Sequence, residues 1–246
     1  LVSWILGECA TVKDVKDAIS KIHVIAIDPR ASTVHWRFAD TTGRQIVLEI
    51  IDGKPVFYEN ELGVLTNSPD FKWQMTNLNN YVNLFPGSAP SQKLGETELS
   101  QFGAGSGFLG IPGDVTPPSR FVKAAFYQAT APVQETSEET ILQGFQILNN
   151  FDIPVGIEFA RGQVPVNIPS ATQWTSATDM NNLKIYFRTM YNSAIRSIDL
   201  KDRFQQSEIP CRTDGYPETA AGVQYQSEIN KKRITSFGVI RFLFIL

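Results

Sequence analysis

Cysteine and histidine are the side chains best suited to nucleophilic or metal chemistry, and this sequence holds two of each. Cys9 and Cys211 cannot build a disulfide framework, and no Cys-x-x-Cys pair indicates zinc. His23 and His35 fall in segments that we assign to the core or to strands, whereas a Ser-His-Asp or Cys-His site needs an accessible loop. The pattern therefore predicts neither a metal nor a cofactor, and it disfavours a catalytic histidine.

A glycine-rich segment, GAGSGFLGIPGD at residues 103–114, is a second candidate for chemistry. It lacks the Gly-Lys-Ser/Thr sequence of a phosphate-binding loop. No βαβ pattern surrounds it, so a dinucleotide-binding fingerprint is also disfavoured. Composition alone makes the segment a surface loop. A nucleotide-binding protein is rejected because the lysine and the acidic metal ligands are missing.

Two pairs of sequence motifs change the interpretation of the glycine-rich segment as a mere surface loop. Residues 63–71, GVLTNSPDF, and residues 77–81, NLNNY, resemble the "TNxPxF…NLxxY" motif of the choloylglycine hydrolase and penicillin V acylase family. Residues 109–114, LGIPGD, and residues 119–121, SRF, resemble its "LPGDxSSxSRF" motif. The match is partial, because VTPP at 115–118 replaces the serine-rich middle.

The resemblance extends over residues 9–200. Residues 172–189, TQWTSATDMNNLKIYFRT, look like the late hairpin of that family. CATVKDVKDAI at 9–19 and the string IDGKP at 51–55 also look like it. Membership would imply a bacterial hydrolase of linear amides, such as conjugated bile salts or penicillin V. An N-terminal cysteine thiolate would attack the carbonyl and form an acyl-enzyme, which water would release.

Two functional positions of the family match residues of this chain. Asn67 corresponds to the asparagine of "TNxP", whose side-chain amide would donate to the oxyanion hole. Arg120 corresponds to the arginine of "SRF", whose guanidinium would lie near the nucleophile and favour its thiolate. Without the resemblance, Asn67 is a turn residue before Ser68-Pro69, and Arg120 is a solvated residue at a helix start, where the dipole disfavours a cation.

The nucleophile of the family has no counterpart in the sequence. Its own α-amino group acts as the base, and such a group has a pKa of about 7.7–8.0. Leu1 has an amine without a nucleophile, and Cys9 has a thiol whose amine is in a peptide bond. We expect one partial domain over 1–246, which is incomplete at the N-terminus, belongs to an amide hydrolase and is inactive alone. The alternative to a part of a working hydrolase is a catalytically inactive fragment or binding remnant of the same fold.

The composition limits the kinds of molecule that this chain is expected to bind. The chain is 42% hydrophobic and 19% charged with a net charge of −3, so no basic field would recruit nucleic acid or anionic lipid. We expect a small-molecule amide substrate and, by resemblance, a homotetramer; the compartment, bacterial cytoplasm or periplasm, is undecided. The apolar residues 237–246 are too few to span a bilayer. A buried strand or foreign sequence is favoured there over a membrane anchor.

Hydrophobic periodicity predicts an α+β fold. Thr11 and Asp14 form a capping box before a helix over 12–22. The remaining elements follow the periods of strands and helices. We expect strands at 34–38, 46–50, 55–58, 63–66, 172–178, 183–189 and 195–200, helices at 71–84, 120–129 and 137–150, and a loop at 86–118. Segregated runs of strands and helices favour a layered α+β fold, and the resemblance implies an αββα sandwich of two antiparallel sheets between helical layers, as in N-terminal-nucleophile hydrolases.

Overall fold

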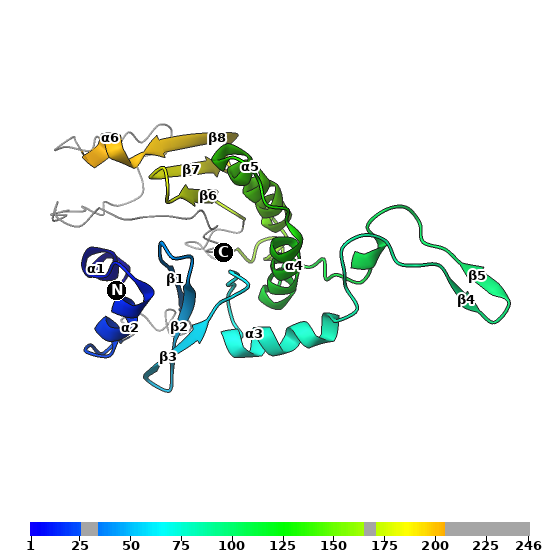
Figure 1. Ribbon diagram of the computed structural model, residues 1–246, viewed down its shortest axis with the longest axis horizontal. Coiled ribbons are helices and arrows are strands. Elements are labelled where there is room, and N and C mark those ends of the chain that lie inside the picture. The colour runs from blue at the N-terminus through cyan, green and yellow to red at the C-terminus, as the bar shows by residue number, and fades with distance from the viewer. Residues whose placement is uncertain (26–33, 165–170, 205–246) are drawn as a thin grey trace.

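A computed structural model describes residues 1–25, 34–164 and 171–204 (Figure 1). The helices are α1 (Val2–Glu8), α2 (Val12–Ile19), α3 (Phe71–Asn77), α4 (Pro117–Thr130), α5 (Ser137–Leu148) and α6 (Leu200–Phe204), with short 3₁₀ turns at Leu78–Tyr81, Ser106–Phe108 and Asn149–Phe151. The strands are β1 (Trp36–Ala39), β2 (Gln45–Ile51), β3 (Lys54–Glu59), β4 (Gln92–Leu94), β5 (Thr97–Leu99), β6 (Trp174–Asp179), β7 (Lys184–Thr189) and β8 (Asn192–Asp199).

The strands form two three-stranded antiparallel sheets and one hairpin, which confirms the α+β class. The first sheet has the order β1-β2-β3 and the second the order β6-β7-β8. Asp52 and Gly53 both have positive φ, of 50° and 73°, as the tight turn between β2 and β3 requires. In the second sheet, Leu183, with φ 56°, precedes β7.

Strand β2 separates two hydrophobic cores because its alternating side chains point to opposite faces. Ile46 and Leu48 pack against α1 and α2 through Ile5, Val12, Val15 and Ile19. Val47 lies on the other face, in a core that joins α3, α4, α5 and β6 through Phe71, Phe121, Phe145 and Ala177. Figure 1 shows α1 and α2 on the outer side of the first sheet and α5 beside the second.

The prediction of a fourth strand over residues 63–66 is wrong. These residues are buried but form no strand and no ladder with β3. Asn60 Nδ2 donates to the Val64 carbonyl at 3.0 Å, and Asn60 N–H bonds to the Gln45 carbonyl. The segment therefore turns away from the sheet after β3. Its apolar run, Val64 and Leu65, reflects burial in the core and not strand pairing.

Three helical predictions also change. Helix α2 ends at Ile19, earlier than expected, so Ile22 is exposed instead of extending the buried stripe. The helix expected over 71–84 divides into α3 and a 3₁₀ turn that ends at Tyr81. Helix α1 was not predicted; it buries only Ile5, which left no periodic stripe to detect. His23, expected in a core or strand segment, is exposed in coil.

The long loop expected over 86–118 contains a projecting arm, residues 86–106, with the β4–β5 hairpin at its tip (Figure 1). Its strands are fully exposed, so no buried alternation marked them in the sequence. Its base is closed by hydrogen bonds from Phe85 N–H to Gly107 O, 3.1 Å, and from Gly107 N–H to Gly87 O, 2.9 Å. A Cβ at Gly107 would lie 2.3 Å from the Phe85 carbonyl oxygen, so this crossing requires glycine.

Among the described residues, no helix is long and apolar enough to cross a membrane. Cys211 and the apolar segment 237–246 lie outside the described residues, and the prediction of a single domain over 1–246 stays a prediction.

Helix α4 starts three residues before the expected boundary, and Asp114 organises that start. One carboxylate oxygen accepts from Ser119 Oγ at 2.6 Å, and the other accepts from Thr116 N–H at 2.9 Å. Pro117 and Pro118 occupy the first helical positions, where a missing N–H costs nothing. Hydrogen bonds from Ser119 and then Thr116 lower the pKa of Asp114 to about 2.

We expect Asp114 to stabilise the fold in a pH-dependent way. Its folded pKa of about 2 lies below the ordinary value of about 3.9. The stabilisation is therefore complete above about pH 4 and is lost as the pH falls towards 2. Asp114→Asn should lower the denaturant midpoint at pH 6, and the gap to the wild type should shrink between pH 4 and pH 2. Asp17→Asn, an exposed change in α2, is the control; a gap for Asp114→Asn that does not change with pH would contradict the assignment.

Candidate active site

Asn67 lies in the connection between β3 and α3, residues 60–70, with its side chain exposed at the protein surface. The segment before it is buried: Val64, Leu65 and Thr66 belong to the protein interior. Asp70 then caps α3 by accepting from Trp73 N–H at 2.8 Å. Asn67 is therefore a solvent-facing residue between a buried segment and a capped helix start.

Arg120 lies in the first turn of α4 and is 6% exposed. Its Nε donates to the Val115 carbonyl at 2.9 Å, and one terminal nitrogen, Nη2, donates to Asn67 Oδ1 at 2.7 Å. The other terminal nitrogen, Nη1, is buried and has no hydrogen-bond partner in the described part of the chain. The sequence-based alternative of a solvated arginine is therefore wrong, and the fold brings together two residues that are 53 positions apart.

This hydrogen bond fixes which way the Asn67 amide points. A guanidinium has only donors, so the carboxamide must turn its oxygen towards Arg120. The amide nitrogen Nδ2 then points away from the guanidinium, and no described residue accepts its hydrogens. The site thus presents an N–H donor at the surface beside a buried cation, one donor of which, Nη1, has no acceptor among the described residues. Such donors suit an oxygen that gains negative charge during a reaction.

Further hydrogen bonds hold the segment that carries Asn67. Thr66 Oγ1 donates to the Pro117 carbonyl at the start of α4, 3.1 Å, and Gln74 of α3 donates to the Asn67 carbonyl, 3.4 Å. Phe71 N–H donates to Glu49 Oε1, 2.9 Å, and Asn60 closes the earlier turn. Strand β2 and helices α3 and α4 therefore all position one short segment.

The electrostatic setting of Arg120 is a buried cation. Burial lowers the pKa of Arg120, and Glu158 acts in the opposite direction. An arginine keeps its charge in proteins despite such shifts. The side chain therefore contributes a permanent positive charge of low solvation, which would favour an anionic group near Nη1.

The other nucleophilic candidates of the sequence lie elsewhere. Cys9 follows α1 and packs at the edge of the α1–α2 core, and burial, with Asp14 and Glu8 nearby, raises the pKa of its thiol. A raised pKa disfavours the reactive thiolate. His35 precedes β1, and its Nδ1 lies 3.0 Å from Glu49 Oε1. Glu49 was not singled out in the sequence, where a single acidic residue within an apolar strand gives no signal of its role.

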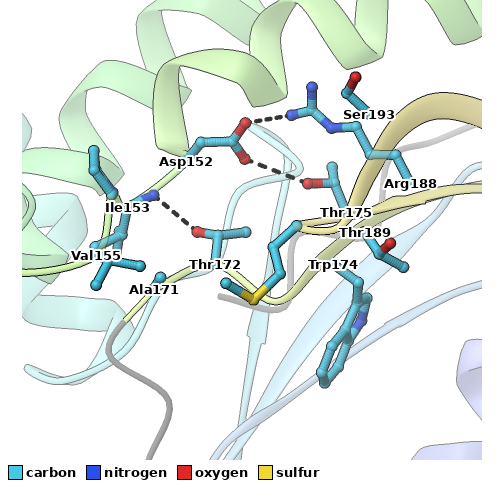
Figure 2. Close-up of a pocket in the computed structure, with 12 residues that line it drawn as sticks. Asp152, Ile153, Val155, Ala171, Thr172, Trp174, Thr175, Arg188, Thr189 and Ser193 are labelled. Carbon is cyan, nitrogen blue, oxygen red and sulfur yellow. Dashed lines mark hydrogen bonds and ion pairs between the residues drawn. The ribbon is translucent and has the colours of Figure 1, made fainter. Parts of the chain in front are cut away.

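A cavity of about 340 Å³ lies elsewhere, between the turn after α5 and the β6–β7 end of the second sheet (Figure 2). Its lining includes the ion pair between Arg188 Nη2 and Asp152 Oδ2, 2.6 Å, and the exposed Trp174. Neither Asn67 nor Arg120 lines it. The ion pair ties β7 to the end of the α5 region, so its geometry indicates a structural contact.

Comparison with known proteins identifies the family to which this arrangement belongs. The model for linear amide C–N hydrolases of the choloylglycine hydrolase family matches residues 1–211. A bile salt hydrolase/transferase from Clostridium perfringens is 34% identical over 84% of this chain. A penicillin V acylase from Pectobacterium atrosepticum is 25% identical over 80% of it.

Solved structures agree on the fold. A mutant of the conjugated bile acid hydrolase from Clostridium perfringens is 35% identical and covers 81% of this chain and 60% of its own, with a TM-score of 0.67. Penicillin V acylase from Agrobacterium tumefaciens is 24% identical, covers 81% of this chain and 54% of its own, and has a TM-score of 0.60, a likeness of fold alone. These similarities confirm the αββα fold implied by the resemblance.

The chain spans 63% and 61% of the length of the bile salt hydrolase/transferases from Clostridium perfringens and Lactiplantibacillus plantarum that it matches. The family model nevertheless covers most of the chain, including both motif regions. The chain belongs to the choloylglycine hydrolase family of linear amide C–N hydrolases.

Proposed function

We propose that this chain forms part of an enzyme that hydrolyses linear amides, and that Asn67 and Arg120 belong to its active site. The hydrogen bond from Arg120 Nη2 to Asn67 Oδ1, 2.7 Å, carries the proposal. It leaves the Asn67 N–H donor facing solvent, where a substrate carbonyl can approach.

In the proposed reaction, a cysteine thiolate adds to the amide carbonyl carbon, and the carbonyl oxygen becomes an oxyanion. Asn67 Nδ2 donates a hydrogen bond to that oxyanion, which stabilises the transition state more than the ground state. The C–N bond then breaks, and the leaving amine takes a proton from the α-ammonium group of the cysteine. Water attacks the resulting thioester and releases the acid. The reaction consumes one water and needs no redox partner.

Arg120 has two roles in this proposal. It orients the Asn67 amide, and its buried charge favours the thiolate form of the nucleophile. Its Nη1, which has no partner in the described part of the chain, would donate to the nucleophile or to a polar group of the substrate. We propose that the nucleophilic cysteine, with its free amine, is neither Cys9 nor Cys211 and belongs to another part of the natural polypeptide.

The substrate class is an amide of an apolar acid, as in conjugated bile salts or penicillin V. Two relatives of this chain have these compounds in their names: one is a bile salt hydrolase/transferase and the other a penicillin V acylase. Identity to the bile salt enzyme is the higher of the two, which favours bile salts. The exposed Trp73 of α3 and the exposed Phe85 follow the Asn67 segment in sequence and are candidates for apolar contact with the acyl group.

The test uses the natural polypeptide that carries this sequence. N-terminal sequencing and intact mass identify its first residue, and release of free amine from conjugated bile salts and from penicillin V measures its activity. A polypeptide that begins with cysteine and cleaves either compound supports the proposal. One that begins elsewhere and cleaves neither is an inactive member of the family, and the proposal is wrong.

Asn67→Ala should lower kcat by about 10²- to 10³-fold, because one oxyanion donor is lost. KM should change little, since the interaction forms mainly in the transition state. Steady-state kinetics with the better of the two substrates give both constants. Asn79→Ala is the control, because Asn79 is also exposed and its side chain donates to the nearby Thr76 carbonyl. Equal kcat values for Asn67→Ala and Asn79→Ala would rule out the oxyanion role.

We also propose that the arm, residues 86–106, makes a contact between subunits of a homo-oligomer. A two-stranded hairpin is marginally stable alone, yet this one projects from the body without a covering element among the described residues (Figure 1). Leu94 and Phe102 expose large apolar side chains along it. Exposed apolar surface on an extended element is typical of an interface. A tetramer is the state implied by the family resemblance.

Phe102→Ser should shift the polypeptide towards smaller species, because it removes apolar area from the proposed contact. Sedimentation equilibrium measures the molar mass over a range of concentrations. The control is Val133→Ser in the loop between α4 and α5, where the valine is just as exposed. A wild-type polypeptide that is monomeric at all concentrations would refute the role of the arm.

A further inference from the structure

A buried carboxylate in the first sheet contacts the element that follows Asn67. Glu49 lies in β2 and is 5% exposed. It shares the face of Val47, which belongs to the core around Phe71 and Phe121. An apolar residue of similar size would avoid the cost of burying a charge, so fold stability alone does not favour glutamate here.

One carboxylate oxygen of Glu49 joins three elements. Oε1 accepts from the backbone N–H of Phe71 at 2.9 Å and lies 3.0 Å from Nδ1 of His35. The β1–β2 register pairs Trp36 with Leu48, which brings His35 opposite Glu49. The second oxygen, Oε2, is buried and has no partner among the described residues. Within the described part of the chain, this carboxylate therefore bonds to His35 and to the first residue of α3.

The start of α3 also contacts the segments that carry the two proposed site residues, Asn67 and Arg120. Phe71 lies four residues after Asn67 and packs edge-on against Phe121, the neighbour of Arg120, with ring centroids 6.0 Å apart. Gln74, one turn further along α3, donates to the Asn67 carbonyl. A shift of the Phe71 backbone would therefore move both the Asn67 segment and the packing beside Arg120.

We propose that Glu49, held by His35, is a positioning residue that sets the place of the Asn67 amide in the oxyanion site. Neither residue touches the substrate. The inference rests on the proposed function of Asn67 and adds the residues that keep its donor in place. Small errors in such placement are costly, since about 1 Å of displacement can reduce a rate by about 10²-fold.

A double-mutant cycle in the natural polypeptide tests this inference. Glu49→Leu should lower kcat by about 10- to 100-fold with little change in KM, because the donor is misplaced only for the transition state. Glu49→Gln keeps an acceptor for Phe71 N–H and should restore kcat to within about threefold. In the Asn67→Ala background, Glu49→Leu should lower kcat less than about twofold further, since the Asn67 donor that Glu49 positions is already gone.

A second measurement does not depend on activity. Hydrogen exchange of the Phe71 amide should accelerate in Glu49→Leu and stay close to wild type in Glu49→Gln. His35→Phe, which keeps a ring but removes the Nδ1 contact with Glu49, should show a smaller effect in the same direction. It replaces Glu49→Leu if that variant fails to fold. Glu59→Gln is the matched control, because the exposed carboxylate of Glu59 bonds to Arg44 and Lys16 and not to α3.

The outcomes separate this inference from the proposed function. If Asn67→Ala leaves kcat unchanged, the oxyanion role is wrong and the positioning role falls with it. If Asn67→Ala lowers kcat but Glu49→Leu costs the same in both backgrounds, Glu49 acts on stability only, and the inference alone is overturned. Unchanged Phe71 exchange in Glu49→Leu or His35→Phe would also overturn it.

Discussion

The hydrogen bond between Arg120 and Asn67 is the constraint on which the site depends. It joins the connection after β3 to the first turn of α4 and requires both to be held within a few tenths of an ångström. Each partner has its own support: Thr66 bonds to the start of α4, and the Arg120 Nε bonds to Val115. The resulting geometry gives one orientation to an amide that would otherwise rotate freely in solvent.

Burial of Arg120 opposes the loss of its hydrogen bonds. A desolvated guanidinium that loses a partner incurs a penalty of several kcal/mol, so its bonds to Val115 and Asn67 are difficult to break. The helix dipole adds to that cost, since a cation at the start of α4 faces the positive end. Arg120 is only 6% exposed, so little water reaches its side chain. The position is therefore unfavourable for an isolated arginine and favourable only with its acceptors in place.

Strand β2 connects the stability of the fold to the site. One face, with Ile46 and Leu48, is purely apolar and packs against α1 and α2. The other combines the apolar Val47 with the polar Gln45 and Glu49. The first face can thus supply hydrophobic stabilisation of about 25 cal/mol per Å², which offsets the cost of buried polar groups on the second. A strand with two apolar faces would be more stable but would leave the Phe71 N–H without its acceptor.

The sequence by itself determined the elements with a clear period and the family motifs. Local pattern predicted helices α4 and α5 and the strands of both three-stranded sheets. The resemblance singled out Asn67 and Arg120 as site residues, and their catalytic roles stay predictions. Only the tertiary structure decided that residues 63–66 are buried coil, that Arg120 is enclosed, and that Glu49 reaches Phe71. Local periodicity records which side chains are buried. It does not record which distant backbone group a buried side chain will meet, because that depends on contacts between segments far apart in the chain.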